Sequence, residues 1–136
     1  MEVGTELVFS VDLCRLFPEH VFVFGDNLLR RGKAGQAVIR DEPNAFGIPT
    51  KRYPAMRDGA FFSDQEDEVD AVVQSLRDLW VFAKGRKVLF PVKGLGTGMA
   101  KMKSKSPVAY WGMCRILSTY FEYNNGELNE STDCTD

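Results

Sequence analysis

Residues 21–37 decide the fold, and they read VFVFGDNLLRRGKAGQA. The first four residues form an uninterrupted apolar run of β-branched and aromatic side chains, which is typical of a strand buried on both faces. The run ends at Gly25 and is followed directly by a loop rich in glycine and basic residues. A strand buried on both faces needs a sheet that helices cover, so this stretch predicts an α/β fold.

Three further segments are expected to join the sheet, and all three are short and apolar. Proline cannot donate to a sheet ladder, so Pro49 and Pro91 are expected at strand ends or on an edge strand. The three segments are residues 6–9, 45–49 and 87–92.

Helices are expected between and after these strands. Ser10 caps a helical turn that Pro18 stops. A long helix begins at a capping box of Ser63 and Glu66 and ends at Lys84–Gly85. Another begins at Ser106–Pro107, with serine as the cap and proline at the first helical position. Phe61 and Phe62 are expected to form a hydrophobic staple at the entry of the long helix, and the alternative is that they stack on an adenine. Trp80 and Trp111 fall on apolar helical stripes and are expected in the core.

Length and composition predict one globular domain of ordinary hydrophobicity. The 136 residues carry a net charge of −2, and 44% of them are hydrophobic. Residues 1–123 are expected to form the domain, and residues 124–136, which contain acids but no lysine or arginine, are expected to form a flexible tail. No run of 18 apolar residues exists and the N-terminus is acidic, so neither a membrane span nor a secretory signal is predicted.

The numbers of cysteine and histidine residues limit which metal sites, disulfides and catalytic groups the chain can form. Three cysteines without a CxxC motif predict neither a disulfide framework nor a zinc ribbon, and favour a reducing cytoplasm. The single histidine, His20, precedes the strand at 21–24, so it is expected at the end of the sheet opposite the glycine loop and in a structural role. No metal and no cofactor is predicted.

A second glycine cluster, KGLGTGMAKMK at 93–103, follows the strand at 87–92 in the same way. If the two strands are parallel neighbours, both loops meet at one edge of the sheet, where ligands bind in such folds. Glycine lets backbone N–H groups approach a ligand closely, and both loops carry basic residues, so we expect an anion site between them. The alternative is that these glycines only form turns. The motifs of the P-loop and of the dinucleotide-binding Rossmann fold are absent.

Four blocks in the chain resemble a known family. They are residues 23–28 (VFGDNL), 32–37 (GKAGQA), 47–51 (GIPTK) and 94–100 (GLGTGMA). In this order the blocks resemble a group of small macrodomain-like proteins of bacteriophages and bacteria. The resemblance implies a three-layer α/β/α sandwich with a mixed sheet, located in the cytoplasm, or in the host cytoplasm if the chain is encoded by a phage.

The resemblance also implies a function, namely binding of ADP-ribose or a related nucleotide diphosphate between the two glycine loops, with ADP-ribosyl hydrolase activity left open. Asp26 and Asn27 would then be the catalytic residues that position water. The alternative for both is that they cap the turn after the strand. The expected ligand-binding residues are Gly25, Arg31, Gly32, Lys33, Gly35, Gln36, Thr50, Lys51, Gly94, Leu95, Gly96, Thr97, Gly98 and Met99.

Two other classes of function stay open beside this one. One is an interaction module that keeps the fold and binds a host protein without nucleotide chemistry. The other is a nucleic-acid binder, but a net charge of −2 argues against it. It would use basic residues in or near the two loops, namely Lys101, Lys103 and Lys105 with Arg30, Arg31 and Lys33.

Overall fold

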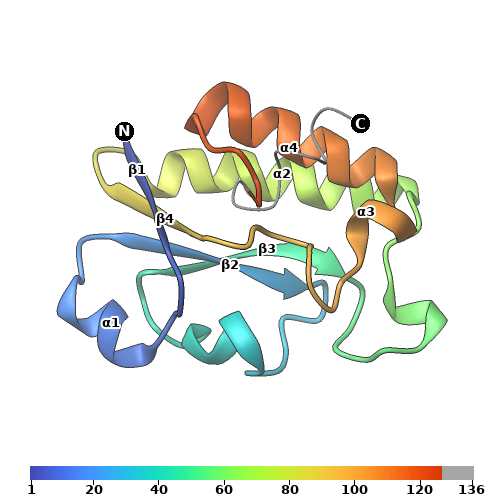
Figure 1. The fold of residues 1–136 in the computed structure, drawn as a ribbon, viewed down its shortest axis with the longest axis horizontal. Helices are drawn as coiled ribbons and strands as arrows, with labels where there is room; N and C mark the ends of the chain where they lie inside the picture. Colours follow the sequence, from blue (N-terminus) through green and yellow to red (C-terminus); the bar gives the residue numbers. More distant parts are fainter. Residues whose placement is uncertain (127–136) are drawn as a thin grey trace.

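A parallel sheet of four strands organises residues 1–126, the part of the chain that the computed structural model describes (Figure 1). The strands lie in the order β1-β4-β2-β3. Both faces of β2 are buried, which confirms the α/β fold predicted from residues 21–24. The strands are β1 (Glu2–Glu6), β2 (Val21–Asn27), β3 (Ala45–Lys51) and β4 (Lys87–Pro91).

The expectation of a mixed sheet is wrong, because every strand pair is parallel. A helical segment crosses over between each strand and the next one in the chain, and such crossovers return the chain in the same direction. The helical segments are α1 (Val11–Leu16), η1 (Gly35–Ile39), η2 (Asp58–Ala60), α2 (Glu66–Phe82), α3 (Met102–Lys105) and α4 (Pro107–Phe121).

The two faces of the sheet carry separate apolar clusters. Val21 and Val23 point to the face that α2 and α4 cover, where Leu76 is one of the helical residues that meet them. Phe22 and Phe24, the alternate residues of β2, pack on the other side with residues of α1 and η1. In Figure 1 the long helices accordingly lie above the sheet, and α1 and η1 lie below it.

The first strand differs from its prediction. A strand was expected at 6–9, but β1 comprises residues 2–6, and the chain then leaves the sheet. Leu7 and Val8 are 70% and 69% exposed, so their apolar character does not reflect a place in the sheet. Pro49 and Pro91 lie as predicted, the first on the edge strand β3 and the second at the last position of β4.

The long helix begins later than its expected capping box. The N-cap is Gln65, and Glu68 completes the box in place of Ser63 and Glu66. Glu68 is fully buried, and its Oε1 accepts hydrogen bonds from the backbone N–H groups of Ser63 (2.7 Å) and Gln65 (3.0 Å). Phe62 is therefore a core residue that lies too far ahead of the cap to staple the helix.

Helix α4 starts at Pro107, as predicted, but its cap comes from another segment. Asp64 accepts the hydroxyl of Ser106 at 2.7 Å and the backbone N–H groups of Val108 and Ala109 at 3.1 and 2.9 Å. Burial raises the pKa of the Asp64 carboxyl, but these hydrogen bonds outweigh it and hold that pKa below its usual value. Asp64 thereby joins the start of α2 to the start of α4.

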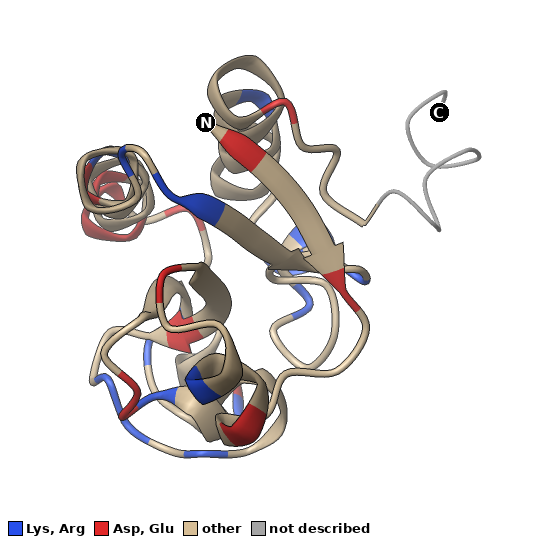
Figure 2. Cartoon of the chain, turned by 90° about the vertical axis from the view of Figure 1, so that its left-hand side faces the viewer, with Lys and Arg blue, Asp and Glu red and all other residues tan. Residues whose placement is uncertain are grey.

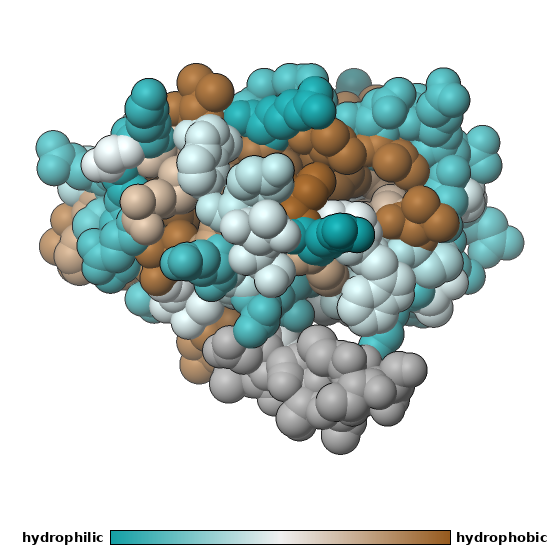
Figure 3. Space-filling view, turned by 90° about the horizontal axis from the view of Figure 1, so that it is seen from above, coloured by the Kyte–Doolittle hydropathy of each residue, from teal (hydrophilic) through white to brown (hydrophobic). Residues whose placement is uncertain are grey.

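The outer face of the helical layer exposes both tryptophans, so the expectation that they are core residues is wrong. Trp80 and Trp111 are each 44% exposed. Trp80 packs edge-on against Phe121 at 5.4 Å between ring centroids, at the border of the seam between α2 and α4. Figure 3 shows hydrophobic side chains along the middle of this face and hydrophilic ones around them. Among residues 1–126, no helix has the length and apolar character needed to cross a bilayer.

Candidate functional site

The two glycine loops line one cleft of about 460 Å³ at the carboxyl ends of β2, β3 and β4. Strands β2 and β4 are parallel neighbours, so the loops that follow them meet at the same edge of the sheet, as the sequence predicted. All the predicted site residues line this cleft except Lys33 and Leu95.

Those two residues are used elsewhere. The ammonium of Lys33 pairs with the carboxylate of Asp41 on the surface, and the Asp41 pKa is lowered by this hydrogen bond and charge. The side chain of Leu95 is fully buried in the core beneath the second loop.

Gln36 connects the two halves of the cleft. Its Oε1 accepts the backbone N–H of Gly25 at 2.8 Å, at the end of β2. Its Nε2 donates to the backbone carbonyl of Gly94 at 3.4 Å, in the second loop. The separation of the two loops is therefore set by one amide side chain.

Asp26 is held by two arginines at the floor of the cleft. Its carboxylate lies 2.7 Å from the guanidinium of Arg40 and 2.9 Å from that of Arg30, and it also accepts the N–H of Asn27 at 2.7 Å. The side chain is 3% exposed, so these contacts replace its hydration. Its Oδ2 would lie 2.4 Å from a Cβ added at Gly47, which explains why β3 has glycine there.

Arg40 and Asn27 fix the backbone of the first loop. Arg40 donates to the carbonyls of Gly32 (2.8 Å) and Arg31 (2.9 Å) in addition to its contact with Asp26. Asn27 donates to the same Arg31 carbonyl at 2.8 Å and accepts the Arg31 N–H at 3.3 Å. This is the turn-capping role that the sequence left open for Asn27. The described contacts of Asp26 and Asn27 are thus all made to the protein itself.

The second loop is braced by the residues that follow α4. Asn125 accepts the N–H of Leu95 at 2.6 Å and donates to its carbonyl at 3.0 Å. A Cβ at Gly94 would lie 2.7 Å from the backbone nitrogen of Gly126, so glycine is required for this contact. Residues 124–126, assigned to a flexible tail from the sequence, thus lie against the glycine loop, and the rest of that tail falls outside the described residues.

Two of the glycines that line the cleft leave backbone facing open space. A Cβ added at Gly35 or at Gly98 would meet no atom within 4 Å, and both residues line the cleft. At Gly96, by contrast, a Cβ would lie 2.6 Å from the Sδ of Met102, so this glycine serves internal packing. Gly98 and Gly35 are therefore cleft positions at which the backbone is not covered by another part of the described chain.

Lys51 and Thr50 bring the end of β3 to the same cleft. The hydroxyl of Thr50 donates to the backbone carbonyl of Asp26 at 3.2 Å and so ties β3 to β2. Lys51 donates to the carbonyl of Ala55 and contacts the sulfur of Met56 at 3.6 Å. Burial lowers the pKa of the Lys51 ammonium.

Sequence reasoning missed several lining residues. Arg40 follows Gln36 by four residues, and a helical turn starting at Gly35 would have been the signal that brings both to one side. The other missed residues lie in the first loop and η1, in the irregular segment after β3, and at the end of the second loop. They are Ala34, Ala37, Pro54, Ala55, Met56 and Ala100.

The remaining titratable groups named in the sequence lie apart from the cleft. His20 stacks on Phe17 with 5.1 Å between ring centroids, before the start of β2. Cys14 is fully buried; burial, with the charge of Glu42, raises the pKa of its thiol to about 11. Within residues 1–126, no group of three or more histidine, cysteine or acidic side chains is placed to hold a metal ion.

Comparison with known proteins changes the family to which the chain is assigned. The chain matches the family described as "Family of unknown function (DUF7831)" over residues 5–115. The comparisons with curated proteins and with solved structures give no match. The resemblance to macrodomain-like proteins is therefore wrong, because the matching family is a different one. The match spans most of the sequence, including both glycine loops, so the chain belongs to DUF7831, a family of unknown function.

Proposed function

We propose that the cleft binds ADP-ribose or a related nucleoside diphosphate, with the diphosphate between the two glycine loops. The observation that carries the proposal is the convergence of both loops on one cleft, with open backbone at Gly35 and Gly98. Backbone N–H groups in such loops are suited to phosphate oxygens because no side chain keeps the anion at a distance.

The charge at the cleft floor supports an anionic ligand. Asp26 would repel a phosphate if it stood alone, but Arg30 and Arg40 both contact its carboxylate. Two positive charges beside one negative charge leave an excess of one positive charge next to the first loop. Arg31 and Lys51 add positive charge from the cleft lining.

The other end of the cleft suits the less polar part of a nucleotide. Pro54, Ala55 and Met56 line it on one side, and Met99 lines it from the second loop. Ligand sites commonly combine apolar walls with a few polar groups that fix orientation. A nucleoside placed here leaves its diphosphate to the glycine loops.

The proposal assigns ligand binding to this site and does not assign Asp26 the role of a general base. The carboxylate accepts from two guanidinium groups and one backbone N–H, so taking a proton from water would require breaking these contacts. Asp26 and Asn27 act as positioning residues for the first loop. The proposal further takes the helices on the two faces of the sheet as the outer layers of a three-layer sandwich, and it places the protein in the cytoplasm.

The test is a thermal-shift titration with ADP-ribose, ADP and inorganic pyrophosphate on the wild type, Gly98→Glu and Gly98→Gln. Position 98 has room for a side chain, so both variants are expected to fold. Gly96 is unsuitable, since any side chain there collides with Met102. Ligand at a hundred times its Kd stabilises the wild type by about 2.7 kcal/mol.

The glutamate variant is expected to lose this shift through charge repulsion, and the glutamine variant of similar size is expected to keep part of it. Equal loss in both variants would mean that only bulk matters and that no anion sits at Gly98. No shift in the wild type at millimolar ligand would overturn the proposal. It would favour the alternative, a partner protein bound without nucleotide chemistry.

A further inference from the structure

Two lysine ammonium groups meet at one aromatic ring beside the cleft. The Nζ of Lys51 lies 5.1 Å from the ring centroid of Phe61, and the Nζ of Lys105 lies 5.2 Å from the same centroid. Lys51 ends β3, and Lys105 ends α3, which follows the second glycine loop. The ring is buried, so it fixes both ammonium groups at the rim.

Neither of these two lysines is paired with a carboxylate, which is also true of other cations of the described chain such as Lys84 and Lys93. Within residues 1–126, neither ammonium lies within 4.0 Å of a carboxylate. At the opposite end, which faces the viewer in Figure 2, acidic and basic residues alternate, and Lys87 lies 3.7 Å from Glu2. The Lys51 ammonium is held by the neutral carbonyl of Ala55 and sulfur of Met56, so these contacts position its charge without neutralising it.

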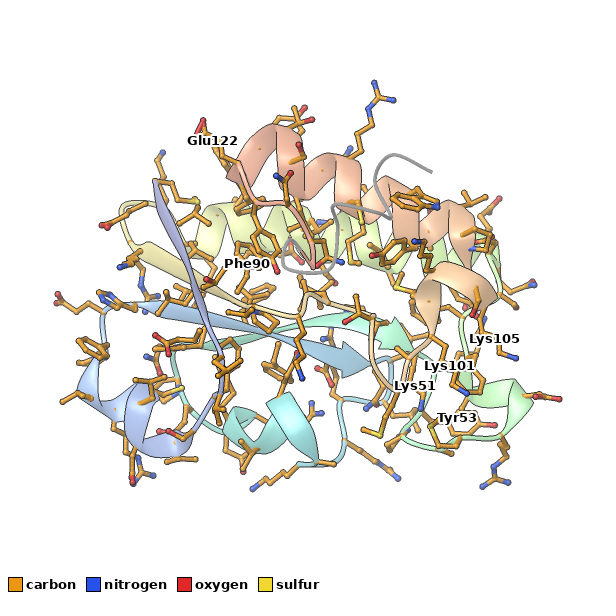
Figure 4. The ribbon with its side chains drawn as sticks, in the orientation of Figure 1. Lys51, Tyr53, Phe90, Lys101, Lys105 and Glu122 are labelled. Carbon is orange, nitrogen blue, oxygen red and sulfur yellow. The ribbon has the colours of Figure 1, made fainter. Side chains whose placement is uncertain are left out.

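The surroundings of Lys51 and the position of Lys101 also favour a bound anion at the rim. Burial lowers the pKa of Lys51, as expected for a cation partly removed from water without a carboxylate beside it, and a bound anion would reverse that shift. Lys101 begins α3 in a left-handed conformation (φ 47°), and Figure 4 shows Lys51, Lys101 and Lys105 at the same end of the molecule. Lys51 and Lys105 lie 5.1 and 5.2 Å from the same ring centroid, so an anion beside this ring is attracted by the charge of both lysines.

We propose that Lys51 and Lys105 form a second anion site, which takes a phosphomonoester of the same ligand that places its diphosphate between the glycine loops. This inference rests on the proposed function, since Lys51 lines the cleft and Lys105 stands at its rim through Phe61. The proposed ligands are therefore nucleoside diphosphate derivatives that carry an additional, separate phosphate.

The experiment compares ligands that differ by one phosphomonoester. NADP⁺ and NAD⁺ form one pair, and coenzyme A and dephospho-coenzyme A form the other; all four carry the same diphosphate linkage. Isothermal titration calorimetry measures Kd for each on the wild type, Lys105→Gln and Lys84→Gln. Lys84 is an exposed lysine just beyond the far end of α2, so its variant removes the same charge away from the cleft.

In at least one pair, the phosphorylated member is expected to bind the wild type about tenfold more tightly, which corresponds to one charge-assisted hydrogen bond. Lys105→Gln is expected to remove that preference and to leave the Kd of the dephosphorylated member unchanged. Lys84→Gln is expected to change neither value.

Equal affinity within both pairs would overturn the second site and leave the diphosphate site standing. A Lys105→Gln effect of the same size on both members of a pair, or the same effect from Lys84→Gln, would also overturn it, because general electrostatics would then suffice. Failure of all four ligands and of pyrophosphate to bind would overturn both proposals together.

Discussion

Arg40 is the side chain on which the first glycine loop depends, since it contacts Asp26 and two loop carbonyls at once. Lysine keeps the charge but lacks the planar fork that reaches three acceptors. We expect Arg40→Lys to lower the free energy of unfolding by about 2 kcal/mol, because the buried Asp26 carboxylate and the Arg31 carbonyl each lose one of their donors and the Gly32 carbonyl loses its Arg40 donor. Urea denaturation measures the change.

Arg15→Lys is the matched control for that substitution. Arg15 pairs with Glu42 through a side chain that is 70% exposed, so lysine can keep the charge contact and a clearly smaller loss than for Arg40→Lys is expected. If both variants lose the same stability, the Arg40 contacts do not hold the loop.

The buried thiol of Cys14 leads to a prediction about its rate of alkylation. It is fully buried and its pKa is raised to about 11, so almost none of it is thiolate at pH 8. Iodoacetamide is expected to label Cys14 about a hundredfold more slowly in the folded protein than in urea. Peptide mass spectrometry follows the modification of this residue. Similar rates in both states would show that the site opens readily.

Among the elements, helix α4 depends on a carboxylate that precedes α2. Asp64→Asn keeps a residue that tolerates the positive φ of 61° but removes the charge from the helix cap. We expect a loss of about 1 kcal/mol at pH 7. Because the folded-state pKa of Asp64 is depressed, its contribution is present above the unfolded pKa, about 4, and is lost as the pH falls through the folded value.

Denaturation of the wild type and Asp64→Asn at several pH values tests this, and the difference between them should shrink below pH 4. Asp70→Asn, on the exposed surface of α2, should show no such difference. A pH-independent gap for Asp64→Asn would mean that the charge does not matter to the cap.

The elements that the sequence predicted well are those with a local signal. The strand at 21–24 is apolar throughout, and Ser106–Pro107 marks the start of α4. Prediction from the sequence failed where contacts with residues far away in the chain determine the local structure. The buried carboxylate of Glu68 moves the start of α2 to Gln65, and no pattern within the helix reports that burial. Residues 6–9 have the composition of a strand, but the sheet takes residues 2–6.

The candidate site divides in the same way. Both glycine clusters follow predicted strands, so their meeting could be inferred from strand order and composition. Asn125 contacts Leu95, which lies 30 residues earlier in the sequence, and Lys105 and Lys51 share only the contact with the Phe61 ring. Contacts of this kind appear only when the chain is folded, because they depend on which elements lie side by side.

For the whole molecule, the functional domain extends to Gly126. A chain ending at Tyr123 loses the two hydrogen bonds of Asn125 to Leu95, whereas a chain ending at Gly126 keeps them. The shorter chain is expected to fold with stability reduced by about 1–3 kcal/mol, because buried polar groups of the loop lose their partners. Thermal unfolding compares the two chains, and pyrophosphate titration reports the state of the cleft.

Asn125→Ala in the full chain should reproduce the loss seen in the chain that ends at Tyr123. If the short chain matches the longer one in stability and in its response to pyrophosphate, Asn125 does not brace the second loop.

The brace supplied by Asn125 also has a consequence during synthesis. The first glycine loop and most of the sheet leave the ribosome well before residues 125 and 126, so the cleft is incomplete until nearly all of the described chain has emerged. In a nascent chain that has not yet exposed residues 125 and 126, the second loop therefore lacks its brace. A ligand that needs the braced second loop would bind only after residue 126 has emerged.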